Sequence, residues 1–205
     1  MQFPLTFSVD YPDRPLSRLS TLLRIFYAIP ILIVLGLISG STYETATDDA
    51  SFAIGTAGGI LVGATALMII FRQKYPRWWF DFNVELTRFS TRVFAYLLLM
   101  DDRYPSTDEQ QAVHLDVVYP DVPNDLNRYA PLWKWFLAIP HYIVLGLLAI
   151  ALFFVVVFAW FAILFTGRYP RSLFEFVEGY LRWANRVGAY TALLVTDQYP
   201  PFGMK

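Results

Sequence analysis

Four arginines at matching positions in two amphipathic segments are the residues of this chain best suited to bind an anion. Acids and bases follow one another there at intervals of three or four residues, so that most of them share one helix face. A charged face beside aromatic residues is typical of a helix that lies in the plane of a membrane interface. The charged residues are Asp81, Glu85, Arg88 and Arg92 in the first segment, and Glu175, Glu178, Arg182 and Arg186 in the second.

Two interpretations of these arginines stay open. In the first, they hold anionic lipid headgroups or an acidic partner surface, each charge contributing about 1 kcal/mol near an anionic membrane. In the second, they form a solvated face that fixes the depth of the helix and pairs with its own acids. The spacing of Glu178 and Arg182 favours such a pair. The binding interpretation requires the arginine-bearing sides of the two helices to converge.

Three further ionisable residues lie within or at the limits of apolar stretches. Arg24 and Lys134 are candidate lipid or partner contacts, although their long side chains can also extend to the interface without binding anything. His141 lies well inside a stretch, where an ionisable group is a functional hypothesis by default. Its counterpart in the first half is Ile31, which favours an unpaired, neutral histidine instead.

Several classes of chemistry are excluded. The chain has no cysteine and two histidines, so we expect no thiolate chemistry and no histidine-rich metal centre. No phosphate-binding loop, dinucleotide fingerprint or hydrolase motif occurs. The basic residues do not cluster as in proteins that bind nucleic acids. We therefore predict a protein that is not an enzyme, without catalytic residues, cofactor, metal or nucleic-acid partner.

The distribution of positive charge indicates a membrane topology. Apolar stretches cover about 22–39, 51–71 and 132–166, and all 16 Lys and Arg lie outside the loop 40–50, which carries only acids. Segments rich in Lys and Arg stay on the cytoplasmic side. The pattern predicts a multi-pass protein with both termini in the cytoplasm and with 40–50 outside.

The chain also repeats itself, with predicted halves of 1–107 and 108–205. Short motifs recur in the same order in both halves. A bias in composition alone would not readily produce the same order twice. The clearest pairs are Tyr11-Pro12 with Tyr119-Pro120, Ile29-Pro30 with Ile139-Pro140, Tyr75-Pro76-Arg77 with Tyr169-Pro170-Arg171, and Tyr104-Pro105 with Tyr199-Pro200.

The repeat predicts an all-α membrane protein. Each half opens with an alternating segment, 5–10 or 113–118, typical of a half-buried strand, and we expect the two to pair. A helical hairpin and an amphipathic interfacial helix follow. The apolar stretch 132–166 is slightly short for two spans, so we place a tight turn near Leu148–Leu152. The fold is thus four transmembrane helices in two parallel-repeat hairpins, two interfacial helices and a small cytoplasmic β element.

Glycines in the second apolar stretch allow close approach of another helix. Gly55, Gly59 and Gly63 are each four residues apart. They favour either an oligomer interface or packing against the first helix of the same hairpin.

The second half resembles a bacterial membrane family known as domain of unknown function 4389. The resemblance rests on Leu164-Phe165-Thr166-Gly167, on the following amphipathic stretch, and on the ending Thr196-Asp197-Gln198-Tyr199-Pro200-Pro201-Phe202. It covers roughly 128–202 and, through the repeat, 18–105. It implies a helical protein of the bacterial inner membrane, and supplies no activity or catalytic residues.

These observations lead to two functional hypotheses. The first is a non-catalytic integral membrane protein, a scaffold, accessory or assembly subunit, with lipids and a membrane-protein partner or a second copy as its contacts. The alternative is a lipid-binding carrier or channel with a cleft between the two repeats. A membrane enzyme is a distant third, because it would need carboxylates or histidines gathered at one depth.

Overall fold

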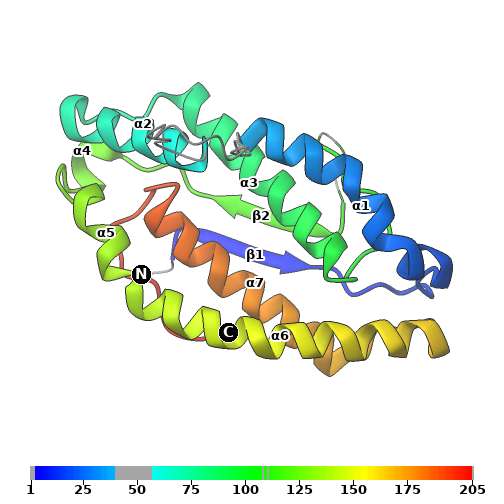
Figure 1. The fold of residues 1–205 in the computed structure, drawn as a ribbon. Helices are drawn as coiled ribbons and strands as arrows, with labels where there is room; N and C mark the ends of the chain where they lie inside the picture. The colour runs from blue at the N-terminus through cyan, green and yellow to red at the C-terminus, as the bar shows by residue number, and fades with distance from the viewer. Residues whose placement is uncertain (1–2, 40–56, 108, 110, 205) are drawn as a thin grey trace, which may run out of the picture.

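The computed structural model describes residues 3–39, 57–107, 109 and 111–204. These residues are mostly helical and form two strands and seven helices (Figure 1). In chain order the elements are β1 (Leu5–Val9), α1 (Arg18–Ser39), α2 (Ala57–Arg72), α3 (Arg77–Leu97), β2 (Val113–Val117), α4 (Val122–Asp125), α5 (Pro131–Leu137), α6 (Ile139–Thr166) and α7 (Arg171–Thr191). The acidic loop and Gly55 lie outside the described residues.

The two strands pair with each other in an antiparallel ribbon, as the alternating segments predict. Phe7 lies opposite Leu115 at its centre. Leu5, Phe7 and Val9 are buried while the residues between them are exposed, which is the two-residue period of a half-buried strand. The cytoplasmic position of this ribbon stays a prediction.

Helices α3 and α7 cover the buried face of the ribbon and form the middle layer. Each begins directly after a Tyr-Pro pair, because the fixed φ of proline suits the residue before a helix start and interrupts the preceding chain. Each packs on the strand of the other half, α3 on β2 and α7 on β1. A leucine in the left-handed region follows the end of each helix, Leu99 after α3 and Leu194 after α7.

The apolar helices form the outer layer. In Figure 1, α1 with α2 and α5 with α6 border the two long sides of the molecule. Helix α1 packs on α3 and α6, α6 on α7, and α2 on α5. Arginines connect the two sides of the molecule at each of its ends. Arg18 donates to the carbonyl of Phe165 (3.2 Å), and Arg128 donates to the carbonyls of Ile70 and Phe71.

The tight turn predicted for the second helical hairpin is wrong. No turn occurs at Leu148–Leu152, because α6 is one continuous helix of 28 residues. Hydropathy had suggested two short spans, but residues 147–166 contain neither Gly nor Pro to interrupt the helix. The chain breaks instead at Ala138, between α5 and α6, where Pro140 in the first turn of α6 supplies no N–H.

The first hairpin is not observed either, within the part of the chain that the structure describes. Helix α1 packs on α3 and α6, and α2 packs on α5. The described parts of α1 and α2 do not pack extensively on each other. Two helices are long and apolar enough to cross a membrane, Arg18–Ile38 and Ile139–Thr166. The apolar part of α2, Leu61–Arg72, is shorter.

Candidate functional site

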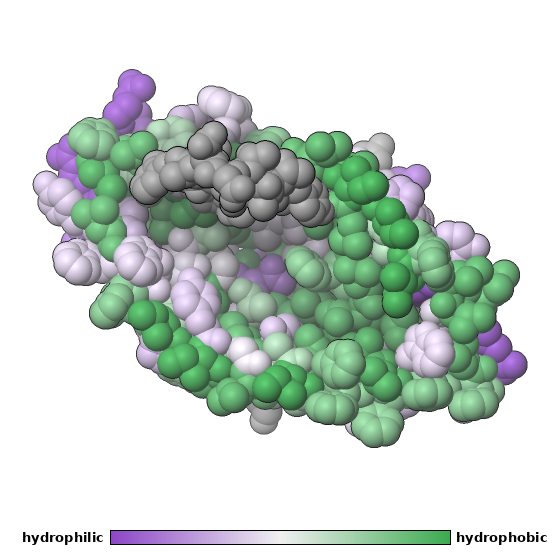
Figure 2. Space-filling view, in the orientation of Figure 1, coloured by the Kyte–Doolittle hydropathy of each residue, from purple (hydrophilic) through white to green (hydrophobic). Residues whose placement is uncertain are grey.

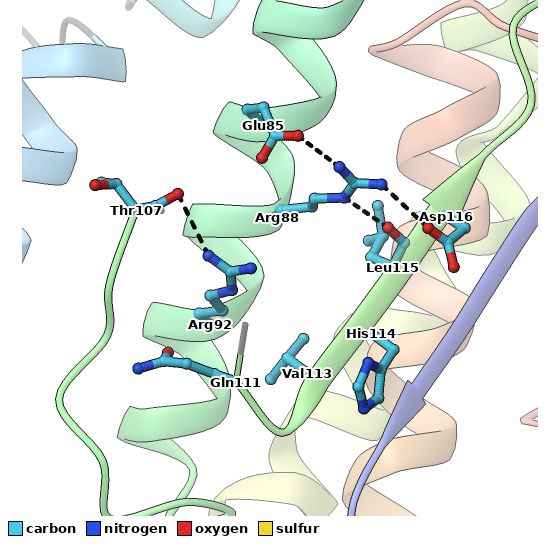
Figure 3. Close-up of a pocket in the computed structure, with 9 residues that line it drawn as sticks. All are labelled: Glu85, Arg88, Arg92, Thr107, Gln111, Val113, His114, Leu115 and Asp116. Atoms are coloured by element: carbon cyan, nitrogen blue, oxygen red, sulfur yellow. Dashed lines mark hydrogen bonds and ion pairs between the residues drawn. The ribbon is translucent and has the colours of Figure 1, made fainter. Parts of the chain in front are cut away.

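Arg88 fastens the middle helix layer to strand β2 (Figure 3). Its Nε donates to the carbonyl of Leu115 (2.7 Å), and its two terminal nitrogens pair with Glu85 (2.5 Å) and Asp116 (3.1 Å). The guanidinium group therefore uses its donors on the protein itself. The carbonyl that it engages belongs to the central residue of the strand.

Arg182 makes the matching contact with strand β1. Its Nε donates to the carbonyl of Phe7 (3.0 Å), Nη1 to that of Met204 (3.0 Å), and Nη2 to Glu178 (2.5 Å). A two-stranded ribbon leaves one edge of each strand without a neighbouring strand. Arg88 and Arg182 each supply a donor to one of these strands, and they do so on different strands.

The other two arginines of the charged faces are also engaged. Arg92 donates to the carbonyl of Ser106 (2.9 Å). Burial, followed by the nearby positive charge of Arg182, lowers the pKa of Arg186. The contacts of Arg88, Arg92 and Arg182 suit the structural interpretation of these residues. Their binding to lipid or to a partner stays a prediction.

A pocket of about 600 Å³ lies between α3 and β2. Arg88 and Arg92 line it with Glu85, Asp116 and His114 (Figure 3). His114 is within 2.9 Å of the carboxylate of Asp10 on the neighbouring strand. The charged groups thus pair with one another around the pocket and do not converge on a shared point. Nowhere in the described ranges do three His, Asp or Glu residues gather as a metal site would require.

Arg24 and Lys134 are both buried, at 2% exposure, and do not extend to the surface. The ammonium group of Lys134 donates to the carbonyl of Thr196 and lies 2.8 Å from the carboxylate of Asp197. Nη1 of Arg24 donates to the carbonyls of Tyr96 (2.6 Å) and Asp101 (2.5 Å). No carboxylate within the described ranges forms an ion pair with Arg24, and its Nε and Nη2 are buried without a hydrogen-bond partner there.

His141 has a partner, which corrects the expectation of an unpaired histidine. The ring is fully buried, and the indole N–H of Trp183 donates to its Nδ1 (3.1 Å). Because Nδ1 accepts this bond, the proton of the neutral ring lies on Nε2. At the matching place in the first half, Ile31 packs with Phe89 in an apolar cluster.

Hydrogen bonds to the carbonyls of two buried tyrosines are contacts that the sequence did not reveal. The hydroxyl of Tyr11 donates to the carbonyl of Tyr169 (2.5 Å), and that of Tyr119 to the carbonyl of Tyr75. Each bond joins one half of the chain to the other. Burial raises the pKa of Tyr75 to about 12 and also raises that of Tyr169. The repeated Tyr-Pro pairs are the signal in the sequence that could have identified these contacts.

Gly63 is the member of the glycine series whose surroundings are described. A Cβ atom at this position would meet no described atom within 4 Å. Close packing against the described residues therefore does not account for Gly63.

The comparisons with known proteins found one family model that matches part of the chain. Residues 128–203 match the model of the family described as domain of unknown function (DUF4389), in agreement with the resemblance found in this part of the sequence. The match does not extend to residues 1–127. The searches of curated proteins and of solved structures returned no match.

The first prediction concerns the arginines on the strands. Replacing Arg88 or Arg182 by Gln removes donors to a strand carbonyl, and each should lower the free energy of unfolding by about 1–3 kcal/mol. Denaturant titration of the purified protein in detergent measures this loss. Arg77→Gln is the matched control, because its pair with Asp81 is exposed and should contribute less than about 1 kcal/mol. Unchanged stability with weakened retention of anionic lipid would contradict the structural interpretation.

The second prediction concerns His141 and Trp183. His141→Ile should lower the free energy of unfolding by about 1–3 kcal/mol, because it leaves a buried indole N–H without an acceptor. Trp183→Phe should also destabilise the protein. The double variant should recover most of the loss, since Ile and Phe occupy the matching places in the first half. Two losses that simply add would show that the pair is not coupled.

Proposed function

We propose that this protein is a non-catalytic membrane protein that serves as a scaffold, accessory or assembly subunit of a membrane complex. The observation that supports this proposal is the exposure of the two long apolar helices. Only 22% of the apolar window of α1 and 17% of that of α6 are buried within the chain. The core helix of a soluble protein would be mostly buried.

The exposed apolar side chains are large and contiguous. On α6 alone, Ile143, Leu147, Phe153, Phe158 and Phe165 are each at least 60% exposed. Fully burying one such side chain contributes about 1.5–3 kcal/mol, so these five represent several kcal/mol of unused stabilisation. Figure 2 shows apolar surface over α1 and α6, bordering a hollow in this face. Patches of this kind mark contacts with a membrane or with another protein.

The order of the layers favours helices that lie in the membrane plane. Helix α6 is about 42 Å long at 1.5 Å per residue, and the ribbon runs beside it within that length (Figure 1). If α6 stood upright, the exposed polar residues Asp10, His114 and Asp116 would lie at hydrocarbon depth. Open strand edges and exposed charges do not occur there. We therefore propose that the apolar layer enters the cytoplasmic leaflet and that the ribbon faces the cytoplasm.

The polar chemistry supports a non-catalytic role. Salt bridges or backbone carbonyls engage Arg88, Arg92 and Arg182. Each acid of the charged faces also has a basic partner: Asp81 pairs with Arg77, and Glu175 with Arg171. Pairing of this kind is what a structural framework requires, and it supports a scaffold role for these helices.

We also propose that the halves 1–107 and 108–205 arose by tandem duplication. Matching residues make matching contacts: Arg88 and Arg182 with the strand centres, Tyr119 and Tyr11 with the loop carbonyls. The left-handed leucines at the ends of α3 and α7 recur in the same way. Such agreement supports a common origin.

A lipid-binding carrier is the second candidate function. An apolar cleft of about 430 Å³ between α1 and α6 favours it, because these helices come from different halves of the chain. The volume falls within the usual range for small-molecule sites, roughly 300–1,000 Å³. Lipid retained in this cleft through purification would support this candidate.

The third prediction tests the orientation. Since the chain has no cysteine, single cysteines at Ser8, Ser41 and Ser106 can be labelled without background. We expect a membrane-impermeant maleimide to label none of them in intact cells, and to label Ser8→Cys and Ser106→Cys in inside-out vesicles. Labelling of Ser41→Cys from outside intact cells would contradict the in-plane arrangement and favour the multi-pass one.

The fourth prediction tests the scaffold role. A photo-crosslinking residue at Leu147 or Phe158 should attach the same membrane protein in repeated isolations in mild detergent, at a constant ratio. The control position is Ser8, which is exposed on the ribbon, away from the apolar layer. A monomer that carries neither protein nor lipid would count against both candidate functions.

A further inference from the structure

The cleft between α1 and α6 contains one charged residue. Its walls are almost entirely apolar, with Ile25 on α1, Leu97 at the end of α3 and Val157 on α6 among the residues that line it. Trp160 closes one part of the cleft, because its indole N–H donates to the carbonyl of Thr21 (3.1 Å) and ties α6 to α1. Arg24 is the only ionisable residue in the lining.

The hydrogen bonds of Arg24 leave half of its guanidinium group unused. Nη1 donates to two backbone carbonyls, and the group lies over the ring of Tyr96 at 4.3 Å. Nε and Nη2 are buried and have no hydrogen-bond partner among the described residues. Nε and one terminal nitrogen of arginine form the edge that binds a carboxylate or phosphate through two parallel hydrogen bonds.

The nearby carboxylates are committed elsewhere. Asp101 pairs with Arg103 (2.9 Å), and Asp102 pairs with Arg14. In the second half the corresponding cation, Lys134, has its own carboxylate at 2.8 Å. The two buried cations therefore differ: Lys134 forms an ion pair, whereas Arg24 lies near Asp101 and Asp102 without an ion pair to any described carboxylate. A buried cation without a counter-ion is costly unless a ligand supplies the negative charge.

We propose that this cleft binds one anionic phospholipid, with an acyl chain between α1 and α6 and the phosphate at the free edge of Arg24. The apolar walls favour a lipid over a small anion, and the unused donors Nε and Nη2 of the Arg24 guanidinium group favour an anionic lipid over a neutral one. The inference rests on the proposed membrane insertion of α1 and α6, which places the cleft among lipid chains.

The test measures bound lipid on the full-length protein. Protein reconstituted with equal amounts of phosphatidylglycerol and phosphatidylcholine is extracted in mild detergent and weighed by native mass spectrometry. We expect one retained phospholipid, with phosphatidylglycerol preferred by tenfold or more. Arg24→Gln should abolish this preference, because it removes the positive charge.

Two tryptophan variants test the cleft independently of Arg24→Gln, which could lose lipid because it folds poorly. Val157→Trp fills the cleft and should prevent retention of either lipid. Phe158→Trp is the matched control, because Phe158 is 65% exposed, does not line the cleft, and should leave retention unchanged. Equal retention of both lipids by the unmodified protein, or full retention by Val157→Trp, would overturn the proposal.

Two further measurements separate the alternatives. Inorganic phosphate at millimolar concentration should not displace the lipid; displacement would indicate a site for small anions and overturn the proposal. Flotation with phosphatidylcholine vesicles reports membrane insertion by itself. Protein that floats without retaining any lipid contradicts this inference and leaves the proposed function intact, whereas protein that fails to float contradicts the proposed function.

Discussion

A two-stranded ribbon has two open edges, and the rest of this structure depends on how they are supported. The chain supports them with arginines from helices: Arg88 reaches Leu115 on β2, and Arg182 reaches Phe7 on β1. An isolated pair of strands is marginally stable in water, so both the arginines and the helix layer beneath the ribbon are needed. Because one strand lies near the start of each half and α3 and α7 each pack on one of them, the ribbon also brings α3 and α7 side by side.

Sequence patterns predicted the ribbon and the middle helix layer well. The alternation in 5–10 and 113–118 predicted the strands and their pairing, and the spacing of Glu178 and Arg182 predicted an ion pair that forms at 2.5 Å. These predictions succeeded because each depends on a period fixed by the local backbone. The outer layer was less predictable. Hydropathy measures how apolar a segment is, but it does not specify whether the segment turns, and α6 continues where a turn was expected.

The candidate site was the least predictable part. The sequence identified Arg24 and Lys134 as a matched pair, but their environments differ through tertiary contacts. Lys134 meets Asp197, whereas Asp102, near Arg24, pairs with Arg14. His141 and Ile31 differ in the same way, each with a partner of suitable polarity on the neighbouring helix. The two halves thus keep the same contacts at the ribbon and differ in the apolar layer, where a ligand would be bound.

The contacts between Arg128 and the end of α2 bear on the order in which the protein is assembled during synthesis. The last carbonyls of a helix lack partners within that helix, and here Arg128 supplies donors to Ile70 and Phe71. This arginine leaves the ribosome more than fifty residues after the helix that it caps. Until then the end of α2 must rely on water for its hydrogen bonds. The end of α2 therefore gains these hydrogen bonds only after the start of the second half has been synthesised.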